Sequence, residues 1–86
     1  MAKSQATLPT LDLHGMTTDE VPNAIDHFLM QCANKKSPRG RIMTGKGTGK
    51  VKKVAIDYLK KAGYPWQHEK MGNGQNNEGV LVVFFD

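Results

Sequence analysis

The chain has 86 residues, of which 38% are hydrophobic and 23% are charged, and its 12 basic and 8 acidic side chains give a net charge of +4. A chain of this length buries a modest core and leaves little room for a second domain. No apolar run approaches the 18 residues that a transmembrane helix needs, so the composition predicts a soluble, globular protein without membrane association.

The start of the chain, residues 1–9, lacks the apolar stretch of a secretory signal and is predicted to be a flexible lead-in. Residues 10–86 are predicted to form one domain. The single cysteine, Cys32, has no partner for an internal disulfide, and its place in an apolar helical stripe indicates a small buried side chain. We therefore expect a cytoplasmic protein.

The first predicted element is a short strand of four or five residues that ends at Gly15. Leu11 and Leu13 alternate with Asp12 and His14, and this period of two turns one side of the strand toward a core. The same period places the Asp12 carboxylate and the His14 imidazole on one strand face.

A helix is predicted next, because Thr17 and Glu20 have the spacing of a capping box at a helix start. Pro22 lies near the first turn, where its missing N–H costs least. One apolar stripe then has the spacing of an amphipathic helix. Its members are Val21, Ala24, Ile25, Phe28, Leu29, Cys32 and Ala33.

A second strand is predicted at 41–44, followed by the glycine-rich loop GKGTG at 45–49. A second helix is predicted from about Lys50 to Ala62, with apolar side chains inside and lysines outside, and Gly63 is a natural end for it.

The remaining pattern predicts a third strand at 66–70, a polar and mobile loop at 71–79, and a last strand at 80–85. The last strand is entirely apolar, which indicates that little water reaches either of its faces. The predicted order of elements is β, α, β, α, β, β.

Two strands joined by a helix should lie parallel, so the first two predicted strands end at the same edge of the sheet. His14 and the 45–49 loop should therefore lie together, where ligands bind in open sheets of this type. A glycine-rich turn at a helix start brings backbone N–H groups up to a phosphate. Lys46 and Lys50 would add positive charge there.

Basic residues are unevenly distributed along the chain. Residues 1–34 hold one lysine against four acids, whereas residues 35–56 hold eight basic residues and no acid. Such a group is either a solvated surface or, if it lies on one side, an electrostatic footprint for a nucleic-acid backbone. The eight are Lys35, Lys36, Arg39, Arg41, Lys46, Lys50, Lys52 and Lys53.

The glycine-rich region excludes an ATPase site and disfavours a dinucleotide site. The stretch GRIMTGKG nearly matches the ATP-binding pattern GxxxxGK[ST], but Gly47 replaces the hydroxyl residue of the pattern. The pattern also needs a strand before its first glycine, whereas here the strand falls between Gly40 and Gly45. GKGTG also lacks the GxGxxG spacing of a dinucleotide site. No set of histidines, cysteines and carboxylates has zinc-ligand spacing, so no structural metal is expected.

His14 is either a hydrogen-bonded structural residue or a group that transfers protons near neutral pH, as phosphodiester cleavage requires. Asp12 could orient the imidazole or bind a cation. His27 lies beside the apolar stripe and His68 in an uncertain segment, so both are weaker catalytic candidates than His14.

The motifs LDLHG at 11–15, TGKGTG at 44–49 and GVLVV at 79–83, in this order, closely resemble the small MutS-related (Smr) domain over roughly residues 11–85. The resemblance implies a two-layer α/β sandwich with two helices and a mixed four-stranded sheet, similar to the C-terminal domain of a bacterial translation initiation factor. It also implies nucleic-acid binding and, as in several members, an endonuclease that nicks DNA or cleaves RNA in repair, recombination or RNA quality control.

The family motifs fall on Asp12, His14 and Gly15 and on the 44–47 segment, while Leu81 stands where members often have a polar residue in the last strand. We expect Asp12, His14 and Lys46 to be catalytic, with Mg²⁺ or Mn²⁺ as an optional cation. The expected nucleic-acid contacts are Gly15, Thr44, Gly45, Lys46, Gly47, Thr48, Gly49, Lys50, Lys52, Lys53, Lys35, Lys36, Arg39 and Arg41.

Two other functions are compatible with the sequence. One is a non-catalytic module that binds branched DNA or structured RNA, and the other is a protein-interaction domain that uses the final strand or a sheet edge. The sequence leaves the oligomeric state and any partner protein open.

Overall fold

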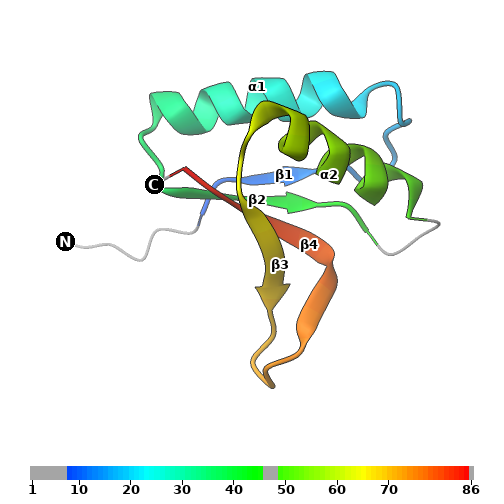
Figure 1. The fold of residues 1–86 in the computed structure, drawn as a ribbon, viewed down its shortest axis with the longest axis vertical. Coiled ribbons are helices and arrows are strands. Elements are labelled where there is room, and N and C mark those ends of the chain that lie inside the picture. Colours follow the sequence, from blue (N-terminus) through cyan, green and yellow to red (C-terminus); the bar gives the residue numbers. More distant parts are fainter. Residues whose placement is uncertain (1–7, 46–48, 86) are drawn as a thin grey trace.

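Two helices cover one face of a four-stranded sheet in this computed structural model, which describes residues 8–45 and 49–85 (Figure 1). The elements follow the predicted order. They are β1 (Thr10–Asp12), α1 (Val21–Asn34), β2 (Arg39–Met43), α2 (Lys50–Ala62), β3 (Trp66–Lys70) and β4 (Asn76–Phe84). The predicted fold class, a small α/β fold with two helices and a mixed sheet, is confirmed.

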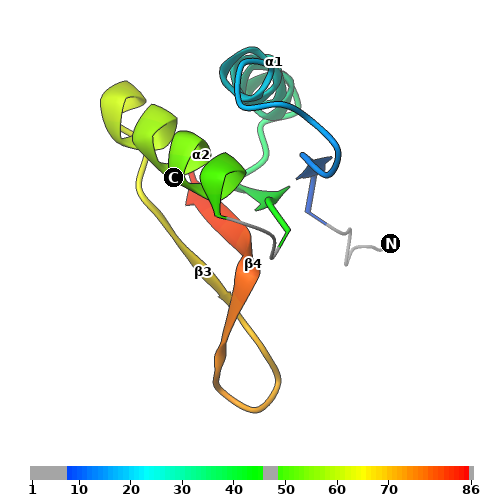
Figure 2. The same cartoon turned by 90° about the vertical axis from the view of Figure 1, so that its right-hand side faces the viewer.

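The strand order is β1-β2-β4-β3, with β1 parallel to β2 and the other two pairs antiparallel. The last strand of the sequence therefore lies between β2 and β3. Because β1 and β2 run parallel, their carboxyl ends meet at one edge of the sheet, as predicted. Seen from the side, both helices lie over the same face and the β3–β4 hairpin extends away from them (Figure 2).

The core lies between the helices and the sheet. Alternate residues of the two central strands, such as Ile42 and Leu81, are fully buried because they point toward the helices. The buried hydrophobic cluster consists of Leu13, Val21, Ile25, Phe28, Leu29, Cys32, Ile42, Ala55, Leu59, Leu81 and Val83. No helix in the described part of the chain is long and apolar enough to cross a membrane.

The helix boundaries match the prediction at α2 and differ at α1. Helix α2 ends at Gly63, which has a φ of 81°. Helix α1 begins at Val21, after the predicted capping box, and no side chain caps it. Only half of the box forms, since Glu20 Oε1 accepts a hydrogen bond from Thr17 N at 2.9 Å. Pro22 in the first turn of α1 accounts for the later start.

Strand boundaries were predicted less well. β1 ends at Asp12, before His14, and β2 begins two residues before the predicted Arg41. The prediction of a loop over 71–79 is wrong in its second half, because residues 76–79 already belong to β4. These polar residues pair with the end of β3, where Glu69 lies opposite Asn77.

A large bulge interrupts β4 within this pairing. His68 and Glu69 are adjacent on β3, but their partners Leu81 and Asn77 are separated by three residues, 78–80. Bulges of this kind bend a strand and redirect its side chains. The bulge lies beside the carboxyl end of β2, because Val80 is also the partner of Met43.

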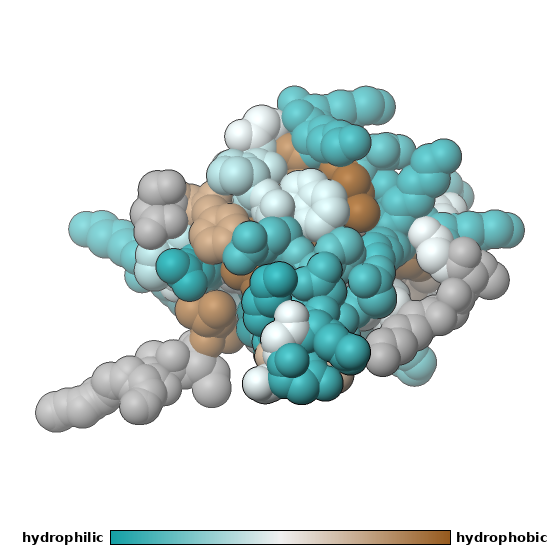
Figure 3. Space-filling model, turned by 60° about the horizontal axis from the view of Figure 1, so that its bottom comes forward, coloured by the Kyte–Doolittle hydropathy of each residue, from teal (hydrophilic) through white to brown (hydrophobic). Residues whose placement is uncertain are grey.

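The face of the molecule seen from the hairpin side is mostly hydrophilic, with apolar side chains in separate patches (Figure 3). It shows no broad apolar area of the kind that usually marks a protein interface.

Replacement of Gly40 by alanine should destabilise the fold. A Cβ at this position would lie 3.0 Å from Phe28 Cε2 and 3.2 Å from Cys32 Sγ, so these buried side chains of α1 would have to shift. We expect Gly40→Ala to lower the free energy of unfolding by about 1–3 kcal/mol in urea titrations. Gly72→Ala, which meets no atom within 4 Å, is the control. Equal stability of the two variants would contradict this packing.

The Cys32 thiol should be unreactive in the folded protein. Its side chain is fully buried, and burial raises its pKa, so little thiolate forms near neutral pH. We expect modification by 5,5′-dithiobis(2-nitrobenzoate) only as fast as the protein opens, with rapid reaction in urea. Rapid labelling of the native protein would contradict the assigned core position.

Candidate functional site

A cleft of about 360 Å³ lies at the edge of the sheet where β1 and β2 end. It brings together residues that are distant in the sequence, including the end of β1, the first residue of the glycine-rich loop and the bulge of β4. The lining residues are Asp12, His14, Met43, Gly45, Asn77, Gly79 and Val80. His14 and Gly45 therefore share one edge, as the topology predicted.

The turn after β1 positions His14 at the cleft. Leu13 is buried and its N–H donates to the carbonyl of Met43 at 2.9 Å, which fixes the turn to β2. The Asp12 carboxylate accepts the backbone N–H of His14 at 2.9 Å. Asp12 thus holds the backbone that carries the imidazole, and the His14 side chain itself is exposed.

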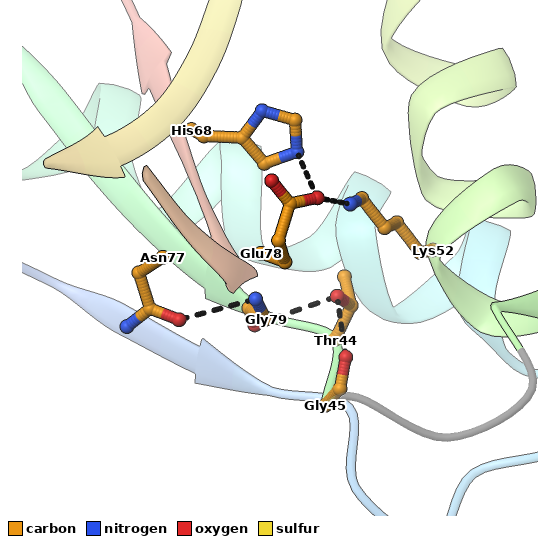
Figure 4. Close-up of polar contacts among 7 residues, drawn as sticks. All are labelled: Thr44, Gly45, Lys52, His68, Asn77, Glu78 and Gly79. Carbon is orange, nitrogen blue, oxygen red and sulfur yellow. Dashed lines mark hydrogen bonds and ion pairs between the residues drawn. The ribbon is translucent and has the colours of Figure 1, made fainter. Parts of the chain in front are cut away.

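The carbonyl of Gly79 joins the bulge to the end of β2 (Figure 4). It accepts the N–H groups of Thr44 at 2.8 Å and Gly45 at 3.3 Å, and the Thr44 hydroxyl at 3.4 Å. Thr44 is only 8% exposed. These groups, which the sequence assigned to phosphate, hold β2 against β4 in the structure, and their contact with phosphate stays a prediction.

Asn77 completes the bulge, because its Oδ1 accepts the N–H of Gly79 at 3.1 Å. Sequence reasoning missed Asn77 and Gly79, since both fell in the predicted loop. An Asn two residues before a Gly is a known signal for a side chain that bonds to the backbone, but it does not indicate a strand.

The glycine-rich loop begins and ends at residues that need glycine. Gly45 has a φ of 79° and Gly49 a φ of 85°, a left-handed region that other residues rarely adopt. Helix α2 starts directly after Gly49, so its first N–H groups lie at the same end of the molecule as the cleft (Figure 1). The predicted site residues Lys46, Gly47 and Thr48 lie outside the described residues.

The basic residues do not form one group. One group lies at the start of α2, near the cleft, and consists of Lys50, Lys52 and Lys53. The other lies around the beginning of β2, at the opposite end of that strand, and consists of Lys35, Lys36 and Arg39 (Figure 1). Arg39 is four residues before Met43 on β2, which is about 13 Å along a strand. The basic residues thus lie at both ends of β2, and their contact with nucleic acid stays a prediction.

Like Lys52, whose partner is on β4, two basic side chains of β2 have partners within the sheet. The guanidinium of Arg41 contacts both carboxylate oxygens of Glu69, with Nε–Oε2 at 2.6 Å and Nη2–Oε1 at 2.9 Å. Arg39 lies over the Phe84 ring, 5.2 Å from its centroid. Arg41 is thus largely neutralised by a bidentate pair, and Arg39 is held at the far end of β2.

The described residues contain no group of three or more histidines, cysteines or carboxylates that could hold a metal ion. Asp12 is the carboxylate that lines the cleft. Among magnesium sites, those in phosphate-handling proteins use one or two carboxylates together with phosphate oxygens of the substrate. Asp12 has the chemistry to contribute to such a site once a phosphate is bound.

A family model described as the Smr domain matches residues 11–86. Among relatives, the chain is 31% identical over 85 residues to a protein named endonuclease MutS2 from Lachnoclostridium phytofermentans, with 99% of this chain and 11% of that protein covered. The namesake from Symbiobacterium thermophilum is 29% identical, with 96% of this chain and 10% of that protein covered. The chain thus spans about a tenth of these relatives.

Two solved structures have the same fold. The crystal structure of the Smr domain of Thermus thermophilus MutS2 matches with a TM-score of 0.76 and 25% identity, covering 90% of this chain and 96% of that one. The crystal structure of the human small-MutS related domain matches with a TM-score of 0.60 and 29% identity, covering 88% of this chain and 99% of that one.

The Asn77 side chain should stabilise the bulge. Asn77→Ala removes the acceptor for the Gly79 N–H, and we expect a loss of about 1 kcal/mol in the free energy of unfolding, measured by urea titration. Asn77→Ser keeps an oxygen that can bond two residues ahead and should lose less. If alanine and serine prove equally stable, the hydrogen bond does not hold the bulge.

Proposed function

Because this chain belongs to the Smr domain family, we propose that it binds nucleic acid through backbone phosphates and acts as an endonuclease, nicking DNA or cleaving RNA. The observation that supports the proposal best is the cleft itself. It joins an exposed imidazole, a carboxylate and the start of a glycine-rich loop at one edge of the sheet.

His14 is proposed as the general acid or base. A phosphodiester is cleaved when a nucleophilic oxygen loses a proton and the leaving oxygen gains one, and histidine transfers protons well near neutral pH. Its exposed side chain lies at the mouth of the cleft, where a bound phosphate could reach it. The bond from His14 N to Asp12 keeps the imidazole near that position.

The other cleft groups are proposed to bind the phosphate. Lys46 and the amides of the 45–49 loop would hold its oxygens, because no side chain blocks the approach to glycine amides. Asp12 is proposed to bind Mg²⁺ or Mn²⁺, which would bridge to the phosphate and neutralise part of its charge.

The division of the basic residues indicates how a substrate would lie. Lys50, Lys52 and Lys53 are close enough to the cleft to contact phosphates next to the cleaved one, without reading the sequence. Lys35, Lys36 and Arg39 would be reached only by a longer substrate that extends to the opposite end of β2. A cytoplasmic role in DNA repair, recombination or RNA quality control, with a partner protein that delivers the target, belongs to the same proposal.

Cleavage should depend on His14. We expect His14→Ala to reduce cleavage of supercoiled plasmid or structured RNA by about 10²- to 10⁴-fold, the usual contribution of a general acid or base, while binding persists. Each substrate is incubated with Mg²⁺, Mn²⁺ or chelator. His27→Ala, which removes an exposed histidine on α1, should cleave like the wild type, and Lys46→Ala should lose phosphate binding.

The same assay separates the alternatives. Equal cleavage by wild type, His14→Ala and Lys46→Ala would show that a contaminating nuclease is responsible. Binding without any cleavage would instead identify a non-catalytic module. A dimer that forms with rising concentration and ignores polyanions, as measured by light scattering, would favour a protein-interaction domain.

Affinity for a short oligonucleotide should depend on the lysines beside the cleft and not on those at the opposite end of β2. We expect Lys53→Met to reduce the slope of log affinity against log salt by about one, since one phosphate contact is lost. Lys35→Met removes the same charge at the far end of β2 and should leave the slope unchanged. Identical slopes for the two variants, measured by fluorescence anisotropy, would place the bound strand elsewhere.

A further inference from the structure

The bulge of β4 turns two neighbouring side chains to opposite sides of the strand. Asn77 points toward the cleft, whereas Glu78 points toward β3 and the start of α2 (Figure 4). There the Glu78 carboxylate lies between two cationic or proton-donating groups that come from different elements, Lys52 of α2 and His68 of β3.

The contacts around this carboxylate are unequal. Lys52 Nζ donates to Glu78 Oε1 at 3.0 Å, a good charge-assisted hydrogen bond. His68 Nε2 lies 3.7 Å from the same oxygen, too far for a hydrogen bond. The lysine is satisfied by this contact, and the imidazole is not.

His68 Nε2 is buried and has no hydrogen-bond partner among the described residues. The imidazole ring packs against Trp66 in a T-shaped arrangement, with the two centroids 5.3 Å apart, and this contact limits its rotation. A buried polar atom without a partner is costly, and a bound anion is one group that would supply the missing acceptor.

We propose that Lys52 and His68 form a second phosphate subsite, which the Glu78 carboxylate occupies until a nucleic-acid phosphate displaces it. The inference rests on the proposed function, since the ligand is a second phosphate of the same strand that enters the cleft. A backbone phosphodiester has two charged non-bridging oxygens, so one can accept from Lys52 Nζ while the other accepts from His68 Nε2.

The exposures of the three side chains agree with such an exchange. Lys52 and His68 are 22% and 21% exposed, so their positions are fixed by packing, whereas Glu78 is 64% exposed and can swing into water. Solvent around the exposed Glu78 side chain weakens its attraction to Lys52, which a phosphate has to overcome. The subsite also adjoins the first turn of α2, where the helix dipole favours an anion.

Removal of the competing charge should therefore strengthen binding. The probes are a fluorescein-labelled single-stranded DNA oligonucleotide and an RNA of the same sequence, titrated at several salt concentrations. We expect Glu78→Gln to bind about two- to fivefold more tightly than the wild type, with a salt slope steeper by about one. Asp57→Asn, the same charge change at an exposed position of α2, is the matched control and should bind like the wild type.

The gain must depend on the two proposed ligands. In a Lys52→Met background, Glu78→Gln should bring no gain, and His68→Phe, which keeps a ring against Trp66 but removes Nε2, should weaken binding. Thermal melts confirm that each variant is folded. The proposal is overturned if Glu78→Gln gains no more than Asp57→Asn, or if its gain survives Lys52→Met.

These results also separate the two proposals. If the wild type binds and cleaves but Glu78→Gln behaves like Asp57→Asn, the second subsite is wrong and the function stands. If no variant binds either oligonucleotide, both are wrong.

Discussion

Both sides of the site depend on the hydrogen bonds accepted by the Gly79 carbonyl. The N–H groups of Thr44 and Gly45 donate to it, which ties the end of β2 to the bulge of β4 at the point where the glycine-rich loop leaves the sheet. Because the bulge is fixed there, Asn77 faces the cleft and Glu78 faces α2. A regular strand would continue its pairing with β3, and Asn77 and Glu78 would no longer be directed to these two places.

Burial of the apolar residues of β4 sets the position of this strand in the sheet, and that position makes the bulge possible. The most apolar segment of the chain, 80–84, takes the central place in the sheet between β2 and β3, where Leu81 and Val83 are fully buried beneath the helices. In its polar extension, residues 76 and 77 pair with the end of β3, and residues 78 and 79 belong to the bulge. The cleft lies at the junction between these two parts, so the packed half of β4 holds the residues that line the cleft in position.

The sequence predicts those parts of the fold whose signals lie close together along the chain. The apolar stripe of α1, the glycine that ends α2 and the parallel β1–β2 pair follow from periodicity and capping, and they place His14 beside Gly45. The bulge could not be predicted, because it arises from a register change between β3 and β4 that no pattern within either strand records. Pairing across the sheet also decides which charges are neutralised, so the Arg41–Glu69 pair and the split of the basic residues were hidden for the same reason.

The three-residue strand β1 stands at one edge of the sheet. An edge this short offers few unpaired backbone groups to another chain, and natural sheets use short edges to avoid unwanted association. The relatives carry a matching segment as about a tenth of a much longer protein. A domain with such a short edge strand can be joined to neighbouring domains without pairing with their strands, and this property suits a segment that the relatives carry within a much longer chain.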